Sequence, residues 1–337
     1  MKSLFSSHHI RICAGLVLGM AGAGPIAAQT YMAALADGGV YIEGSTHPRV
    51  EVLDNSGWTE GTAPTGQLRA SVSLLAPEPR VGTRGSFQSR AETALGGIHL
   101  YARAFAHASH SDLGLQTRAN AGGNGNGIFL DSFALNVPGY APGALFTVTG
   151  RVRIEGSSSH TADSLLLDLG GYRSSGGSRS YAGWESVVTL KRSGATTDLV
   201  ALYDRGECAK NGSDTSVRCT GGAPGWRSFS FAMPNQSWSA KVSMSAWASA
   251  GAIADIAGIG SASADSVIDF GRTIAWDGIT ELRDATGALI ADYSATSASS
   301  GFDYRNAYVT AVPEPNAVLL LLAGLAALGW VVQRRRA

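Results

Sequence analysis

The stretch SWSAKVSMSAWA, residues Ser237–Ala248, carries the clearest fold signal in the sequence. Apolar residues occupy its even-numbered positions, and mostly polar residues occupy the odd-numbered ones. A repeat of two places the apolar side chains on one face of an extended strand, whereas a helix would need a repeat of 3.6. We therefore predict a β-strand with one buried face, and the predicted buried set is Trp238, Ala240, Val242, Met244 and Ala246.

Similar short runs recur along the chain and are separated by Gly, Asn, Asp and Pro, the residues that favour turns. Alternation of apolar and polar residues, with one face of the sheet exposed to solvent, is typical of antiparallel sheets rather than of a parallel α/β sheet. The sequence therefore predicts an all-β fold, with an antiparallel β-sandwich or jelly-roll-like ectodomain over residues 29–293. The predicted strands are residues 40–43, 49–53, 68–75, 98–106, 127–137, 144–154, 164–169, 181–191, 198–203, 227–233, 237–248, 266–270, 272–276, 279–283 and 289–293.

Three segments have loose sequences rich in small residues. Residues 118–127 read RANAGGNGNG, and residues 173–180 read RSSGGSRS. Because such sequences offer few side chains to pack, we predict that they are loops. Each is either a long loop of one sandwich or a seam between two subdomains, and both alternatives stay open. Residues 294–311, also small and polar at their start, are predicted to be a linker.

The N-terminus has the three parts of a secretory signal peptide. Lys2 and Arg11 flank a charged first region, an apolar, glycine-rich stretch follows at residues 12–23, and small residues precede Gln29. This order predicts export by the general secretion machinery and cleavage by signal peptidase between Ala28 and Gln29. Cleavage after Ala27, or retention of the segment as an anchor, is the alternative. Residues 1–28 are therefore assigned as a signal peptide.

The C-terminus ends in an apolar run followed by charges. Residues 317–332 carry no charge, and Arg334, Arg335 and Arg336 follow them. As a helix, the run would span about 24 Å, slightly less than the hydrocarbon core of a bilayer, and flanking arginines can cover such a mismatch. We predict one transmembrane helix with the arginines in the cytoplasm and everything before Pro313 on the far side. A buried core helix is the alternative.

The residues before this run complete a recognisable tail. Proline fixes φ and keeps the preceding residue out of the helical region, so Pro313, Glu314 and Pro315 form a stiff, extended motif. Together with the apolar run and the arginines, this tail (residues 312–337) resembles the PEP-CTERM sorting signal of Gram-negative, exopolysaccharide-producing bacteria. The resemblance implies recognition of the motif by an exosortase, cleavage there, and transfer from the inner membrane to the cell surface or extracellular matrix. Arg334, Arg335 and Arg336 would be the stop signal.

Charge and cysteine content agree with export. The whole chain has 26 basic and 26 acidic residues, and removal of both targeting segments leaves 21 and 25, a net charge of about −4. No basic stripe interleaved with aromatic residues is present, so we expect no nucleic-acid partner. Cys13 leaves with the signal peptide, and Cys208 and Cys219 remain as a pair. In an oxidising compartment we predict a disulfide between them, worth about 3 kcal/mol.

The sequence contains no convincing catalytic or metal motif. His107 and His110, with Asp112, are the closest approach to a ligand cluster, but they lack the Glu and the spacing of the zinc-protease helix. Two isolated cysteines also lack further ligands nearby. A glycine-flanked nucleophilic serine and a phosphate-binding loop are absent as well. We therefore expect no metal, no cofactor and no enzymatic activity.

Five tryptophans leave two interpretations open. They either offer exposed rings for sugars to stack on or pack in the core, and core packing is favoured for Trp238, which alternates with apolar residues. Three functional hypotheses remain: a structural or adhesive protein of the biofilm and exopolysaccharide, a carbohydrate-binding module, and a secreted polysaccharide hydrolase. The five tryptophans are Trp184, Trp226, Trp238, Trp247 and Trp276.

Overall fold

The computed structural model describes residues 31–44, 47–56, 59–61, 68–75, 83–109, 117–166, 177–192, 195–212, 214–254 and 259–308. The predictions for residues 1–28 and 312–337 lie outside these ranges. Within the described ranges every element of regular structure is a strand, and every strand pair is antiparallel. The all-β prediction is therefore confirmed.

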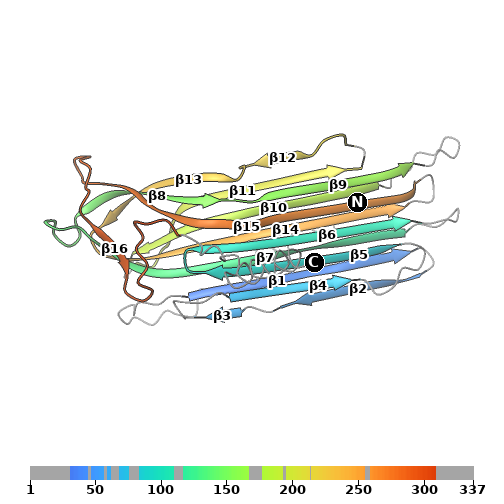
Figure 1. Cartoon of the computed structure of the whole chain (residues 1–337), viewed down its shortest axis with the longest axis horizontal. Coiled ribbons are helices and arrows are strands. Elements are labelled where there is room, and N and C mark those ends of the chain that lie inside the picture. The colour runs from blue at the N-terminus through green and yellow to red at the C-terminus, as the bar shows by residue number, and fades with distance from the viewer. Residues whose placement is uncertain are drawn as a thin grey trace, which may run out of the picture.

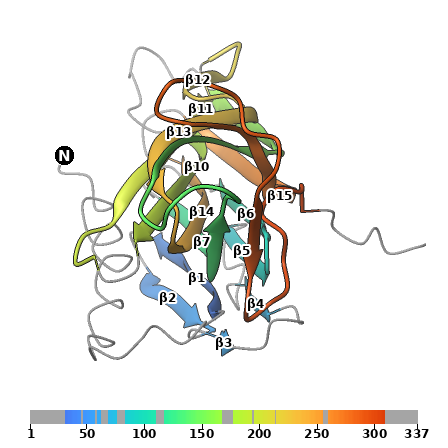
Figure 2. The same ribbon diagram turned by 90° about the vertical axis from the view of Figure 1, so that its left-hand side faces the viewer.

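The strands form two sheets that face one another across a shared core. Figure 1 shows them running along the long axis of the molecule, and Figure 2 shows the two layers end-on. The first sheet, sheet A, has β7 and β14 at its centre. Its described strands are, in spatial order, β12 (Arg218–Gly221), β11 (Leu199–Asn211), β10 (Gly177–Arg192), β14 (Ser237–Ala254), β7 (Thr117–Asn136), β1 (Tyr31–Gly44) and β2 (His47–Asn55), with β16 (Ser294–Ser297) beside β7 and β3 (Thr59–Gly61) beside β1.

Sheet B lies opposite and is built around the longest described strand, β15. This strand pairs with β6 and β9 along its first half, and with β8 along its second half after an irregularity in register. Strands from both halves of the chain therefore occur in both sheets. The described strands of sheet B are, in spatial order, β13 (Gly225–Pro234), β8 (Leu145–Ile154), β15 (Ile259–Arg283), β6 (Gly97–Ser109), β5 (Arg84–Ala94) and β4 (Leu68–Leu75), with β9 (Ser157–Leu166) beside β15.

The predicted alternation of β14 matches its observed burial. All of its even-numbered residues from Trp238 to Ala254 are buried, and the odd-numbered ones lie on the outer face. The inward residues change from large to small along the strand, from Trp238 at one end to alanine at every inward position from Ala246 onward. Strand β6 opposite shows the same change, from Leu100 to a series of alanines. The core is thus aromatic at one end of the sandwich and alanine-rich at the other.

The prediction that the glycine-rich segment 118–127 is a loop was wrong. The segment lies inside β7, where it pairs with β1 on one side and β14 on the other. Its inward glycines make room for large side chains of sheet B: a Cβ on Gly127 would lie 2.3 Å from a methyl carbon of Ile98, and one on Gly123 would lie 2.7 Å from the ring of Phe87. The low side-chain content that suggested a loop is therefore a packing requirement.

Other boundaries also differ from the predictions. Residues 177–180 belong to β10, while residues 173–176 lie outside the described ranges. Strand β5 and most of β9 were missed, and residues 289–293 contribute a single isolated bridge rather than a strand. The predicted linker, residues 294–311, is wrong for its described part. Residues 294–308 pack against both sheets, as described next.

Candidate functional site: the C-terminal strap

The C-terminal strap, residues 294–308, is the last described part of the chain and directly precedes the predicted sorting motif. It begins with β16, which adds to the end of β7 in antiparallel register, with Ser294 opposite Asn136 and Ser297 opposite Phe133. The chain then turns, and Tyr304 N donates a hydrogen bond of 2.8 Å to the carbonyl oxygen of Ala295. The strap is therefore a folded part of the sandwich rather than a tether.

A buried carboxylate on β7 accepts hydrogen bonds from hydroxyl groups of the strap. Asp131 is fully buried, and its Oδ1 accepts hydrogen bonds from Ser297 Oγ at 3.0 Å and Ser299 Oγ at 2.9 Å. Its Oδ2 accepts from Ser300 Oγ at 2.8 Å and Tyr304 OH at 3.1 Å. A buried charge is tolerated only when its hydrogen-bonding capacity is met, and here the strap meets it. Asp131 thus acts as an anchor, and these contacts do not leave it exposed as a catalytic base.

Tyr304 inserts into the aromatic end of the core. Its side chain is fully buried, its ring centroid lies 4.4 Å from that of Phe133 in a stacked arrangement, and it meets Trp276 edge-on at 5.4 Å. Trp276 Nε1 and Ile279 N both donate to the carbonyl oxygen of Tyr304, at 2.8 and 2.9 Å. Burial, and then the neighbouring Asp131 carboxylate, raise the pKa of Tyr304 well above its usual range. The phenol is therefore held in its neutral, hydrogen-bond-donating form.

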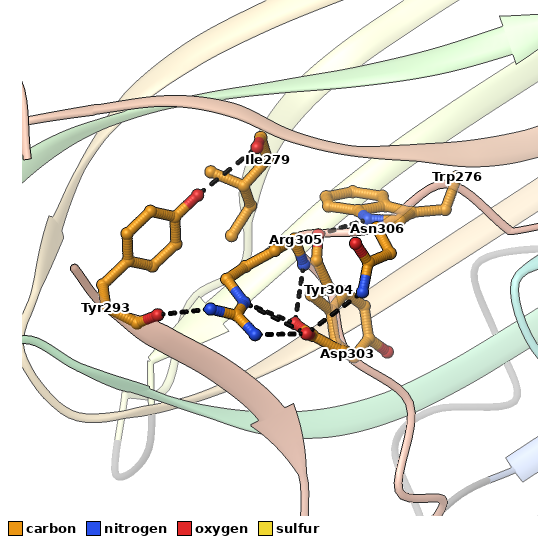
Figure 3. A network of polar contacts seen from close by, with 7 residues as sticks. All are labelled: Trp276, Ile279, Tyr293, Asp303, Tyr304, Arg305 and Asn306. Atoms are coloured by element: carbon orange, nitrogen blue, oxygen red, sulfur yellow. Dashed lines mark hydrogen bonds and ion pairs between the residues drawn. The ribbon is translucent and has the colours of Figure 1, made fainter. Parts of the chain in front are cut away.

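A second polar network fixes the outer side of the strap (Figure 3). The Arg305 guanidinium donates to both Asp303 oxygens and, through one further nitrogen, to the carbonyl oxygen of Tyr293 at 2.8 Å. Asn306 Nδ2 donates to Asp303 Oδ2 at 3.1 Å. Hydrogen bonds from Arg305 lower the pKa of Asp303. This network therefore links Asp303, Arg305 and Asn306 to one another and to the backbone of Tyr293.

The strap leaves the sandwich at Tyr308, beside β15. Tyr308 N donates a 2.7 Å hydrogen bond to the carbonyl oxygen of Trp276, and its ring covers Gly96 and Gly97 at the turn between β5 and β6. A Cβ on Gly96 would lie 2.6 Å from the Tyr308 ring, and Gly96 has a φ of 80°, so glycine suits this position for two reasons. The domain therefore holds the chain as far as Tyr308, and only four residues, 309–312, separate Tyr308 from the predicted motif at Pro313.

Sequence reasoning missed this strap, although one signal for it was present. Asp131 occupies an inward position between Phe129 and Phe133 in an alternating strand, where an acidic residue needs a buried partner. The partners lie more than 160 residues further along the chain and are mostly serines, which composition alone assigns to a linker.

The remaining predicted sites fall in different places. Cys208 and Cys219 form a disulfide that joins β11 to β12 at the edge of sheet A. His107 lies on β6, where burial and the nearby Arg84 lower its pKa, while His110 and Asp112 lie outside the described residues. Among the residues that the structure describes, no group of three or more His, Cys, Asp or Glu side chains could hold a metal ion.

The five tryptophans divide into two groups. Trp184, Trp238 and Trp276 are buried in the core, so the core interpretation is confirmed for them. Trp247 lies on the outer face of sheet A, where the Arg205 guanidinium carbon stands 5.3 Å from its ring centroid. Trp226, at the start of β13, is 48% exposed.

The outer face of sheet B also has a shallow hollow of about 280 Å³. It lies over β5 and β6, where the small Ser86 pairs with Phe105 and Gln88 pairs with Arg103. Arg84 stands over the Phe105 ring, 5.3 Å from its centroid, and the Arg103 guanidinium is paired with Asp265. The hollow thus combines one aromatic ring with several hydrogen-bonding groups.

Comparison with known proteins identifies only the tail. A family model described as the PEP-CTERM protein-sorting motif matches residues 311–336. The chain carries this motif, as predicted. No curated protein and no solved structure matches the chain. Among the described residues, which stop at Tyr308, no helix is long and apolar enough to cross a membrane.

Proposed function

We propose that this chain is an exported protein that exosortase recognises and cleaves at Pro313, Glu314 and Pro315, and that it has a non-enzymatic structural or adhesive role in the extracellular matrix. The sorting motif at residues 311–336 is the observation that carries this proposal. The disulfide between Cys208 and Cys219 supports it, because disulfides form and persist in the oxidising environment of exported proteins. Signal peptidase, the general secretion machinery and the inner membrane would be its partners before processing, and exopolysaccharide afterwards.

The intact mass of the protein from its native host tests the sorting step. We expect a mature form that begins at Gln29 and ends near Pro313, and that depends on exosortase. In a strain without exosortase, the mass should include Arg334, Arg335 and Arg336. If the arginines are retained in both strains, the tail is only a membrane anchor, and the proposed sorting is wrong.

A second candidate function is carbohydrate binding, which the hollow over β5 and β6 favours. Its Phe105 ring and the polar groups of Gln88 and Arg103 match what a sugar offers, an apolar face edged by hydroxyl groups. The test is retention on immobilised host exopolysaccharide. We expect Phe105→Ala to reduce retention at least tenfold, and Trp247→Phe, on the opposite sheet, to leave it unchanged. Equal retention of both variants would exclude the hollow.

A further inference from the structure

Trp226 is a large apolar side chain held on the outer face of sheet B by two arginines. The guanidinium carbon of Arg151 lies 4.4 Å from the indole centroid, and that of Arg153 lies 5.3 Å away. Asp277 pairs with Arg151, and Glu155 lies 3.3 Å from Arg153. These contacts fix the ring against the sheet while it stays 48% exposed. We call Trp226, Arg151 and Arg153 the Trp226 patch.

The patch lies close to the point where the chain leaves the domain. Arg153 pairs with Trp226 on one side and with Ala275 on the other, and Ala275 is next to Trp276, whose carbonyl oxygen holds Tyr308. Two strand spacings, about 10 Å in total, therefore separate Trp226 from β15, and Tyr308 lies about one further spacing away, on the β6 side of β15. Figure 2 shows the red end of the described chain beside β15.

The length of the remaining chain limits how far the patch can be from the membrane. Eight residues, 309–316, connect Tyr308 to the first residue of the predicted membrane helix, Ala317. Even fully extended, the nine Cα–Cα steps from Tyr308 to Ala317 span at most about 32 Å. Because residues 294–308 are folded onto the sandwich, they add nothing to this reach. Before cleavage, the exit face of the domain must therefore stay near the lipid surface.

We propose that the Trp226 patch contacts the phospholipid headgroups of the membrane that holds residues 317–332. This inference rests on the proposed function, because it needs the uncleaved tail in a bilayer. An indole ring with one apolar face and one polar edge suits the boundary between headgroups and acyl chains. The Arg151 and Arg153 side chains are 40% and 37% exposed. Their guanidinium groups can donate to lipid phosphates, and the apolar stem of arginine tolerates the same boundary.

The short connection through residues 309–316 explains how so small a patch can bind the membrane. One tryptophan and two arginines are a weak membrane anchor by themselves, but a short covalent connection gives them a high effective concentration at the bilayer. Cleavage at Pro313 removes that connection. The patch thus orients the precursor for processing. It dissociates from the membrane once the tail has been cleaved.

Quenching of tryptophan fluorescence in the full chain after signal-peptide removal tests the contact. The protein is reconstituted in phospholipid vesicles that carry a nitroxide on the headgroup, and wild type is compared with Trp226→Phe and Trp247→Phe. Trp330 lies in the predicted membrane helix and contributes equally to all three. We expect Trp226→Phe to remove a quenched component that Trp247→Phe leaves in place. If the two variants lose equal quenched signal, the proposal is wrong.

Two further comparisons identify what the patch recognises. Vesicles of zwitterionic and of anionic phospholipid should both quench Trp226, because phosphate is common to both, and Arg153→Gln should weaken the quenching in each. If host exopolysaccharide instead shields Trp226 while vesicles do not quench it, the patch binds sugar and the membrane assignment fails. Failure of the sorting function itself would be seen separately, as an intact mass that keeps Arg336 in the native host.

Discussion

Replacement of Asp131 by alanine should release the strap while leaving the rest of the sandwich folded. The change removes the acceptor for four strap hydroxyls, on Ser297, Ser299, Ser300 and Tyr304. The buried Ser297 and Tyr304 hydroxyls and the half-buried Ser299 and Ser300 hydroxyls lose their carboxylate acceptor. At about 1–3 kcal/mol for each buried group that loses its partner, we expect a total cost of about 3–5 kcal/mol. Since these four groups all belong to the strap, local opening of the strap relieves most of that cost.

Amide hydrogen exchange measured by mass spectrometry resolves this local effect. At about 1.4 kcal/mol per factor of ten, a cost of 3–5 kcal/mol increases the open population of residues 294–308 by a hundredfold or more. Peptides from the alanine-rich second half of β14 and from β6 beyond Leu100 should keep their wild-type protection, since they lie further along the sandwich from Asp131. Strap peptides should therefore exchange faster in the variant, and core peptides should not.

Asp265→Ala is the matched control. It also removes an acidic residue from a strand, but Asp265 pairs only on the surface of sheet B with Arg103, and such pairs contribute about 1 kcal/mol or less. Strap exchange should match wild type in this variant. If Asp131→Ala leaves strap exchange within threefold of wild type, the strap does not depend on the buried carboxylate and the reasoning above is wrong.

Three other outcomes follow from the packing. Gly127→Ala should lower the free energy of unfolding by about 1–3 kcal/mol. Gly177→Ala should change it little in urea titrations, because its Cβ would make only an ordinary van der Waals contact with Ser164 Oγ at 3.7 Å. Replacing Cys208 and Cys219 by serine should cost up to about 3 kcal/mol and speed exchange in β12, seen by the same exchange method. Burial lowers the pKa of His160, so the unfolded state binds its proton first and stability falls as pH drops below about 6.5. His160→Gln should weaken that decline, and an unchanged decline would contradict it.

The alternation of apolar and polar residues was sufficient to predict the fold class. Each strand of a two-sheet sandwich carries its own period of two, so Ser237–Ala248 could be assigned without any tertiary information. The sorting tail was equally readable, because a targeting signal is recognised as a linear segment, and the family match at residues 311–336 agrees with it.

The sequence misled where the role of a residue depends on a distant partner. Glycines in residues 118–127 looked like a loop because their function is to accept Phe87 and Ile98 from the other sheet. Serines in residues 294–300 looked like a linker because their acceptor, Asp131, is remote in sequence. In both cases the local composition was the same as that of an unpacked segment.

Local pattern by itself therefore determined that this protein is built from strands and carries an export tail, since strand periodicity and linear signals need no long-range contact. Only the tertiary structure decided that the chain stays folded up to Tyr308, that Trp184, Trp238 and Trp276 are core residues, and that Trp226 lies within three strand spacings of Tyr308, where the described chain ends. These features arise from pairing between strands far apart in the chain, whose register depends on all the side chains packed between the two sheets.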